Sequence, residues 1–118
     1  MKNFFWLILL AVLSLSACKT QVSILGDSYS TFGGYVKPDT NYVWYGVPNQ
    51  APHNDVTQVE EMWWYSIVNE AGYKLEVNNS FSGSTVCHTG YEAADYSDRS
   101  FITRLTKLGK PDVIIVFG

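Results

Sequence analysis

The chain has 118 residues, of which 47% are hydrophobic and 16% are charged, a composition typical of one globular domain rather than a disordered segment. Its formal net charge of −3 excludes the basic surface that nucleic-acid binding requires. No cluster of His, Cys, Asp and Glu has the spacing of a metal site, so the sequence predicts neither a metal ion nor a cofactor.

Residues 1–17 have the composition of an export signal. Lys2 supplies a positive charge, and an almost wholly apolar run from Phe4 to Leu15 follows it. This run would rise about 18 Å as a helix, which is too short for a hydrocarbon core of about 30 Å. We therefore expect a cleaved signal peptide over residues 1–17 rather than a membrane-spanning helix.

The export signal ends in Leu15-Ser16-Ala17-Cys18, which is similar to the lipobox of bacterial lipoproteins. The resemblance implies acylation of Cys18, a lipidated tether over residues 18–21, and a membrane-anchored protein in the bacterial cell envelope, facing the periplasm or exposed on the surface. The alternative is an ordinary secretory cleavage site that precedes a cysteine. If Cys18 is acylated it cannot form a disulfide, and Cys87 is then interpreted as a small, partly buried thiol.

The first predicted strand covers Val22-Ser23-Ile24-Leu25, a short apolar run that ends at Gly26. Residues 29–56 have no clean period and many glycines and prolines, so we expect a long loop, which is often a functional feature. Aromatic side chains in this loop either pack it onto the sheet or form a substrate wall. These side chains are Tyr29, Phe32, Tyr35, Tyr42, Trp44 and Tyr45.

A helix is predicted to begin at Thr57, because Thr57 and Glu60 have the spacing of a capping box. Gly72 is typical of its end. Apolar residues four apart predict one buried stripe, formed by Val59, Trp63, Ile67 and Ala71. A second strand follows, in which Leu75 and Val77 alternate with charged residues, and it runs into Asn78-Asn79-Ser80.

A second helix is predicted from about Asp98 to Leu108, with one apolar face composed of Phe101, Ile102, Leu105 and Leu108. The continuous apolar run from Asp112 to Phe117 then predicts a third strand that is buried on both faces. Strands that alternate with helices indicate an α/β fold, here a three-layer α/β/α arrangement with a parallel, flavodoxin-like sheet. Since the chain stops at Gly118, beside the expected active-site edge, we expect residues 22–118 to be the N-terminal portion of a longer domain.

Polar segments follow the first two predicted strands directly. Gly26-Asp27-Ser28 follows the first strand, and Asn79 to Gly83 follows the second. Because the carboxyl ends of parallel strands lie side by side, we expect Gly83 to bring a backbone N–H close to Ser28. A serine hydroxyl above this edge, with N–H groups facing it, is the arrangement that stabilises an oxyanion. Gly-Asp-Ser alone is also typical of a simple turn, in which Asp27 would hold the backbone by hydrogen bonding.

With these segments in this order, the chain resembles the SGNH, or GDSL-type, hydrolase family. Residues 22–28 match the first family block, residues 78–83 match the second, and residues 112–118 match the start of the third. The resemblance implies the SGNH hydrolase fold and serine acyl-ester chemistry, with Ser28 as nucleophile and the N–H groups of Ser28 and Gly83 as oxyanion donors. The asparagine of the third block and the late Asp-x-x-His have no counterpart, so we expect the chain alone to lack esterase activity.

The expected substrate is a small ester or an O-acylated carbohydrate, cleaved through an acyl-enzyme, and acyl transfer to another acceptor would use the same chemistry. Candidate residues of the substrate wall are Tyr29, Trp44, Tyr45 and His88. His53 and His88 do not stand where the family has its catalytic histidine, and His53 is interpreted as a loop residue. The alternatives are a non-catalytic, flavodoxin-like binding lipoprotein and an inactive gene product, because the fold alone does not define a function.

Overall fold

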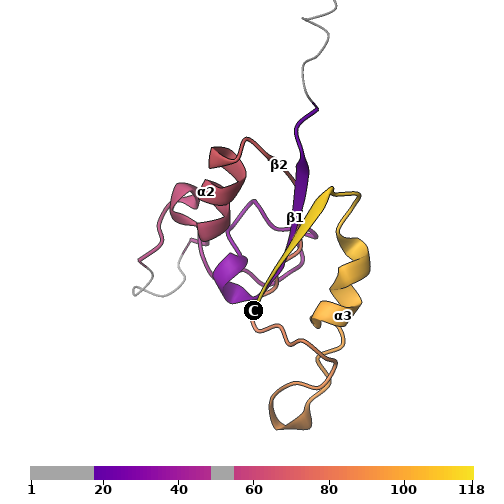
Figure 1. Cartoon of the computed structure of the whole chain (residues 1–118). Helices are drawn as coiled ribbons and strands as arrows, with labels where there is room; N and C mark the ends of the chain where they lie inside the picture. Colours follow the sequence, from indigo (N-terminus) through magenta and orange to yellow (C-terminus); the bar gives the residue numbers. More distant parts are fainter. Residues whose placement is uncertain (1–17, 49–54) are drawn as a thin grey trace, which may run out of the picture.

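A computed structural model of the chain describes residues 18–48 and 55–118. The predicted signal peptide and His53 lie outside these residues. The described segments include three strands and two α-helices, and the helices lie on opposite sides of the strands (Figure 1). In chain order the elements are β1 (Gln21–Gly26), the 3-10 helices η1 (Ser28–Ser30) and η2 (Val59–Glu61), α2 (Trp63–Glu70), β2 (Lys74–Asn78), η3 (Tyr91–Ala93), α3 (Phe101–Arg104), η4 (Leu105–Lys107) and β3 (Val113–Phe117).

The three strands form one parallel sheet in the order β2-β1-β3, which confirms the predicted α/β class. β1 and β3 pair in continuous register as far as Gly26 and Phe117. The β1–β2 register shifts between Val22 and Ile24. At this irregularity the buried Ser23 hydroxyl donates to the Leu108 carbonyl at 2.7 Å and accepts from the Val77 N–H at 3.2 Å, so a side chain replaces the regular ladder.

The central strand β1 is buried on both faces, as its apolar run predicts. Leu25 packs with Phe101 and Leu108 on the side of α3. Ile24 belongs to the larger cluster on the other side, together with Phe32, Tyr45, Val59, Met62 and Trp64. Since alternate residues of a strand face opposite sides, β1 joins the two halves of the core. Burial of each large aliphatic side chain contributes about 1.5–3 kcal/mol to stability.

The predicted capping box of the first helix is wrong by one residue. Glu61, not Glu60, provides the carboxylate, whose Oε2 accepts from the N–H of Gln58 at 3.0 Å and of Thr57 at 2.7 Å. These two hydrogen bonds lower the pKa of Glu61. Met62 then has extended backbone, with ψ of 134°, and it separates η2 from α2.

The predicted buried stripe is wrong in part, because the extended residue Met62 changes which side chains of the following helix face the core. The buried positions are Val59, Trp64 and Val68, whereas Ile67 is exposed. The predicted end of the helix is confirmed: Gly72 has a φ of +70°, and the N–H of the next residue, Tyr73, donates to the Val68 carbonyl at 2.8 Å.

The second predicted helix begins later than expected, at Phe101, where the Ser100 hydroxyl accepts from the Thr103 N–H at 3.2 Å. Phe101 is buried, as predicted, and so is Leu108 beyond the end of η4. The remaining residues of the predicted apolar face, Ile102 and Leu105, are exposed, and the cation Arg104 is buried in their place.

β3 is not buried on both faces, in contrast to the prediction from its apolar run. Its side chains are 40–58% exposed at Val113, Ile114, Val116 and Phe117. The strand lies at one edge of the described sheet and pairs with β1 alone. The helices within the described residues leave both faces of β3 partly open. The strand is therefore more apolar than its burial among these residues requires.

Candidate active site

The turn after β1 brings Ser28 to the carboxyl-terminal edge of the sheet. A Cβ atom at Gly26 would lie 2.4 Å from Ser30 Oγ and 2.8 Å from Ser80 Oγ, so only glycine fits this close approach. The Asp27 carboxylate accepts from the Tyr29 N–H at 2.9 Å, which confirms the expected hydrogen bond within the turn. Ser28 is the first residue of η1, and it is partly exposed.

The segment after β2 continues alongside β1 and ends in a tight turn. Its Phe81 N–H donates to the Gly26 carbonyl at 3.1 Å, and the Ser84 N–H then donates back to the Phe81 carbonyl at 3.2 Å. Gly83 occupies this turn with a φ of +78°. Within residues 18–48 and 55–118, the N–H groups of Ser28 and Gly83 have no hydrogen-bond acceptor, so both are available to a ligand at this edge.

Buried polar side chains fasten the two turns to each other. The Asn78 amide nitrogen donates to the Ser30 carbonyl at 2.9 Å, and the Ser80 hydroxyl donates to Asn78 Oδ1 at 2.6 Å. From the long loop, the Asn41 amide nitrogen donates to Asn79 Oδ1 at 2.9 Å. These side chains are almost fully inaccessible to water, so the network fixes the backbone that carries Ser28 and Gly83.

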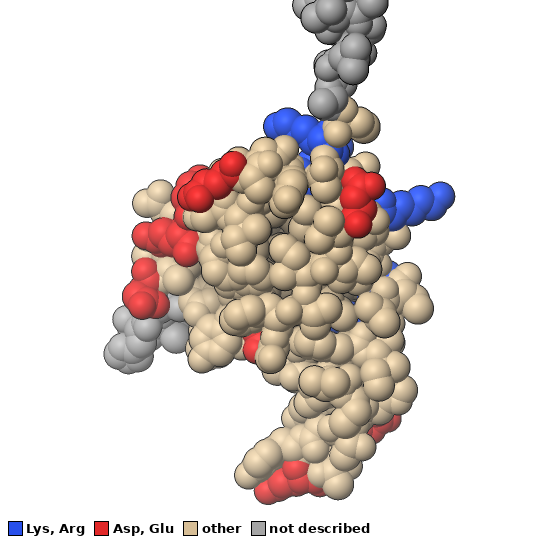
Figure 2. All heavy atoms as spheres, viewed as in Figure 1, with Lys and Arg blue, Asp and Glu red and all other residues tan. Residues whose placement is uncertain are grey.

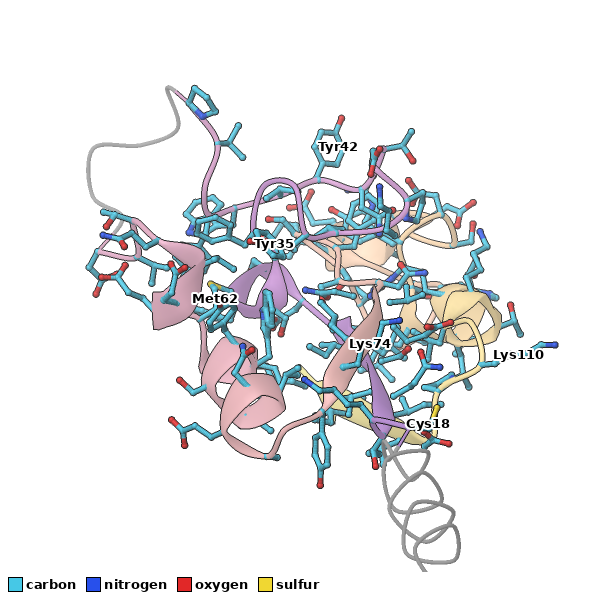
Figure 3. All side chains as sticks on the ribbon, turned by 90° about the horizontal axis from the view of Figure 1, so that it is seen from above. Cys18, Tyr35, Tyr42, Met62, Lys74 and Lys110 are labelled. Carbon is cyan, nitrogen blue, oxygen red and sulfur yellow. The ribbon has the colours of Figure 1, made fainter. Side chains whose placement is uncertain are left out.

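A cavity of about 330 Å³ opens beside the Ser28 turn, and its lining is mainly apolar. The Trp63 ring stacks on Phe117 at 4.8 Å, and its Nε1–H donates to the Ser30 hydroxyl at 3.2 Å. Met62, in the 59–70 segment, is buried among neighbouring side chains, whereas Tyr42 projects outward (Figure 3). The lining residues are Tyr29, Tyr45, Val56, Glu61, Met62, Trp63 and Phe117.

Tyr45 is the buried tyrosine of this cavity, with 8% of its surface exposed. Burial raises its pKa above the ordinary value, and the nearby Tyr29, Asp55 and Asp27 act in the same direction. The phenol therefore stays neutral at physiological pH and offers a hydrogen-bond donor to a bound group.

The candidate wall residues fall into two groups. Tyr29 and Tyr45 line the cavity, whereas Trp44 and His88 are not among its lining residues. Trp44 is exposed on the long loop, and its N–H donates to the Thr31 hydroxyl at 2.8 Å. Of the six aromatic residues of the loop, Phe32 and Tyr45 are buried. Tyr35 and Tyr42 are more exposed, but the Tyr35 ring contacts Phe32 and Trp64 and the Tyr42 ring contacts Phe81.

His88 lies on an arm, residues 85–98, that projects beyond the sheet (Figure 1). The arm closes on itself, because the Tyr96 N–H donates to the His88 carbonyl at 2.7 Å. The His88 ring is exposed, with Nε2 at 3.3 Å from the Thr103 hydroxyl. Cys87 is also exposed, which corrects the expectation of a partly buried thiol, and Cys18 is exposed and unpaired as well.

Five residues of the cavity lining were not assigned to the site from sequence: Val56, Glu61, Met62, Trp63 and Phe117. They belong to the end of the long loop, the predicted first helix and the end of the third predicted strand. The place of Phe117 at the carboxyl end of a parallel strand was the one signal that pointed toward the site.

Charged groups lie mainly at the periphery of the face shown in Figure 2, with acidic side chains over the 59–70 segment and at the tip of the arm. The described residues contain no group of His, Cys, Asp or Glu that would hold a metal ion. None of the helices in residues 18–48 and 55–118 combines the length and the apolar character needed to cross a membrane.

Comparisons with known proteins agree with this geometry. The family profile described as GDSL-like Lipase/Acylhydrolase matches residues 20–118. A crystal structure of a protein assigned as a GDSL-like lipase from Bacteroides uniformis is 66% identical in sequence, with a TM-score of 0.83. A similar protein from Bacteroides ovatus is 59% identical, with a TM-score of 0.79. Both alignments cover 86% of this chain but 48% of the other, so this chain spans about half the length of these relatives. A search of curated proteins finds no significant match.

Proposed function

Because the chain belongs to the GDSL-like lipase/acylhydrolase family, we propose that it provides the nucleophile and oxyanion hole of an exported serine esterase. The observation that carries this proposal is the pair of unpaired N–H groups, on Ser28 and Gly83, at the edge where Ser28 is partly exposed. Two such donors match the requirement of a tetrahedral intermediate for fixed dipoles around its oxygen.

In the proposed reaction the Ser28 oxygen bonds to the ester carbonyl carbon while its proton passes to a base. The alcohol then leaves with that proton, and water releases the acid from the acyl-enzyme by the same steps. The family resemblance assigns the base to a late Asp-x-x-His, and the solved relatives are about twice as long as this chain. We therefore propose that residues 18–118 alone do not turn over esters.

The proposed substrate is a small ester or an O-acyl group on a carbohydrate. The apolar cavity beside the Ser28 turn fits the acyl group, because aromatic and thioether side chains form most of its lining. Trp44, which is exposed on the adjoining loop, offers a flat apolar face to a sugar ring on the alcohol side.

A hybrid tests this function, in which residues 18–118 replace the matching part of the Bacteroides uniformis protein. We expect it to hydrolyse p-nitrophenyl esters and to prefer butyrate over acetate about tenfold in kcat/KM, since each buried methylene contributes about 0.8 kcal/mol. Release of acetate from an O-acetylated oligosaccharide tests the carbohydrate substrate. Binding of the oligosaccharide without hydrolysis of any ester would favour the alternative of a binding lipoprotein.

We also propose that Cys18 carries the lipid of a bacterial envelope lipoprotein, since it is exposed and directly follows the lipobox-like residues Leu15-Ser16-Ala17. We expect intact-mass measurement of the membrane fraction to show acylation at residue 18 and loss of residues 1–17. Cys18→Ala should move the protein to the soluble fraction, whereas Cys87→Ala, at the other exposed cysteine, should leave it on the membrane. An unmodified, soluble wild-type protein would contradict this assignment.

A further inference from the structure

Arg104 is a deeply buried cation in α3, with 2% of its surface exposed. Its Nε donates to the Arg99 carbonyl at 3.1 Å, and its Nη1 donates to the Asn79 carbonyl. The guanidinium lies 5.0 Å from the centre of the Phe101 ring, and Nη2 is buried without a hydrogen-bond partner in the described structure. The ion pairs recorded among the described residues are Lys37–Asp39 and Arg99–Asp98, so no carboxylate pairs with Arg104 there.

Arg104 remains charged at neutral pH despite this environment. Burial lowers its pKa to about 10, and the negative charge of Asp27 acts in the opposite direction. A buried cation is costly, and a well-packed apolar side chain of similar volume often gives equal or greater stability. Packing alone therefore gives no reason for a guanidinium at this position.

Arg104 contacts the segment that carries Gly83 directly, and it is connected with the Ser28 turn through Asn79 and β1. Asn79, whose carbonyl it holds, is the first residue of the segment that leads to Gly83. The Asn79 N–H donates to the Ile24 carbonyl of the neighbouring strand β1 at 2.8 Å. β1 continues from Ile24 into the Ser28 turn, where the Asp27 carboxylate accepts from the Tyr29 N–H.

We propose that Arg104 is a positioning residue, which fixes the N–H groups of Ser28 and Gly83 relative to each other by holding the Asn79 carbonyl, and with it the segment after β2, against β1. Arg104 touches no substrate in this role, because its guanidinium is enclosed. The proposal rests on the proposed function, since it concerns the oxyanion hole of the same reaction.

The test measures kcat and KM separately in the hybrid esterase. We expect Arg104→Met to lower kcat about 10- to 100-fold, because a displacement of about 1 Å at a catalytic group can cost 10²-fold. KM should change less than twofold, since oxyanion donors act mainly in the transition state. Arg104→Lys, which keeps the charge but not the fork of nitrogens, should restore part of the lost kcat.

The matched control is Ser23→Ala, which removes the two hydrogen bonds of the Ser23 hydroxyl at the β1–β2 irregularity and lies outside the proposed machinery. It should lower the melting temperature and leave kcat unchanged. A full kcat in Arg104→Met, with only a lower melting temperature, would overturn the positioning role. If Arg104→Met does not fold, the lysine variant decides in the same way: an unchanged kcat overturns the proposal, and a reduced kcat at constant KM supports it. Esterase activity in the Ser28→Ala variant of the hybrid would instead contradict the proposed function itself.

Discussion

Ser28→Ala in the hybrid esterase should abolish ester hydrolysis, with a fall in kcat of the order of 10⁶-fold, the loss known for a serine protease without its nucleophile. The side-chain oxygen that forms the acyl-enzyme is then absent, and the remaining N–H donors have no covalent intermediate to stabilise. The measurement is stopped-flow or steady-state turnover of p-nitrophenyl butyrate, together with labelling by a fluorophosphonate probe.

Ser82→Ala is the control for this result, because Ser82 is a partly exposed serine on the neighbouring turn. We expect it to retain stoichiometric labelling and nearly full turnover. If the Ser28→Ala protein were still labelled by the probe at a single site, the nucleophile would have to be sought at another residue.

Gly83→Val should lower kcat by about 10²–10³-fold, or roughly 3–4 kcal/mol, which is the typical effect of losing one oxyanion donor. An added Cβ at Gly83 meets no atom of the described protein within 4 Å, so a clash is not the reason. The reason is the φ of +78°, which a β-branched residue does not adopt without strain. The turn must then rearrange, and the N–H group rotates away from the oxyanion.

Gly34→Val separates backbone strain from the loss of the donor. Gly34 has a similar φ of +82° and equally open surroundings, but it lies on the long loop. We expect both variants to lose stability to a similar extent, whereas only Gly83→Val should lose kcat. Equal kinetics for the two variants would exclude the Gly83 N–H from the oxyanion hole.

Local signals in the sequence predicted the strands and the two turns. The apolar run at Val22–Leu25 and the stop at Gly26 require no distant residue, and the structure confirms both. The same holds for Gly72, where a positive φ ends α2. The position of Gly83 in its turn follows from the same preference of glycine for this region.

The errors arose where tertiary contacts override the local pattern. A single extended residue, Met62, shifted the buried stripe of α2. In α3, the pattern assigned Ile102 to the core, but the core contains Arg104, because its hydrogen-bond acceptor belongs to Asn79, far away in sequence. The cavity depends on three separate segments, so no single window of sequence predicts its shape.

The direct path from Cys18 into β1 has a geometric consequence for the substrates that the proposed enzyme meets. β1 begins at Gln21 and is six residues long. The tether then spans at most about 10 Å, and the strand spans about 20 Å. A lipid on Cys18 would thus keep Ser28 within about 30 Å of the membrane surface. Hydrolysis would be confined to a thin layer above the bilayer, and the rate in the cell would depend on how much acylated material enters that layer rather than on its concentration in the bulk.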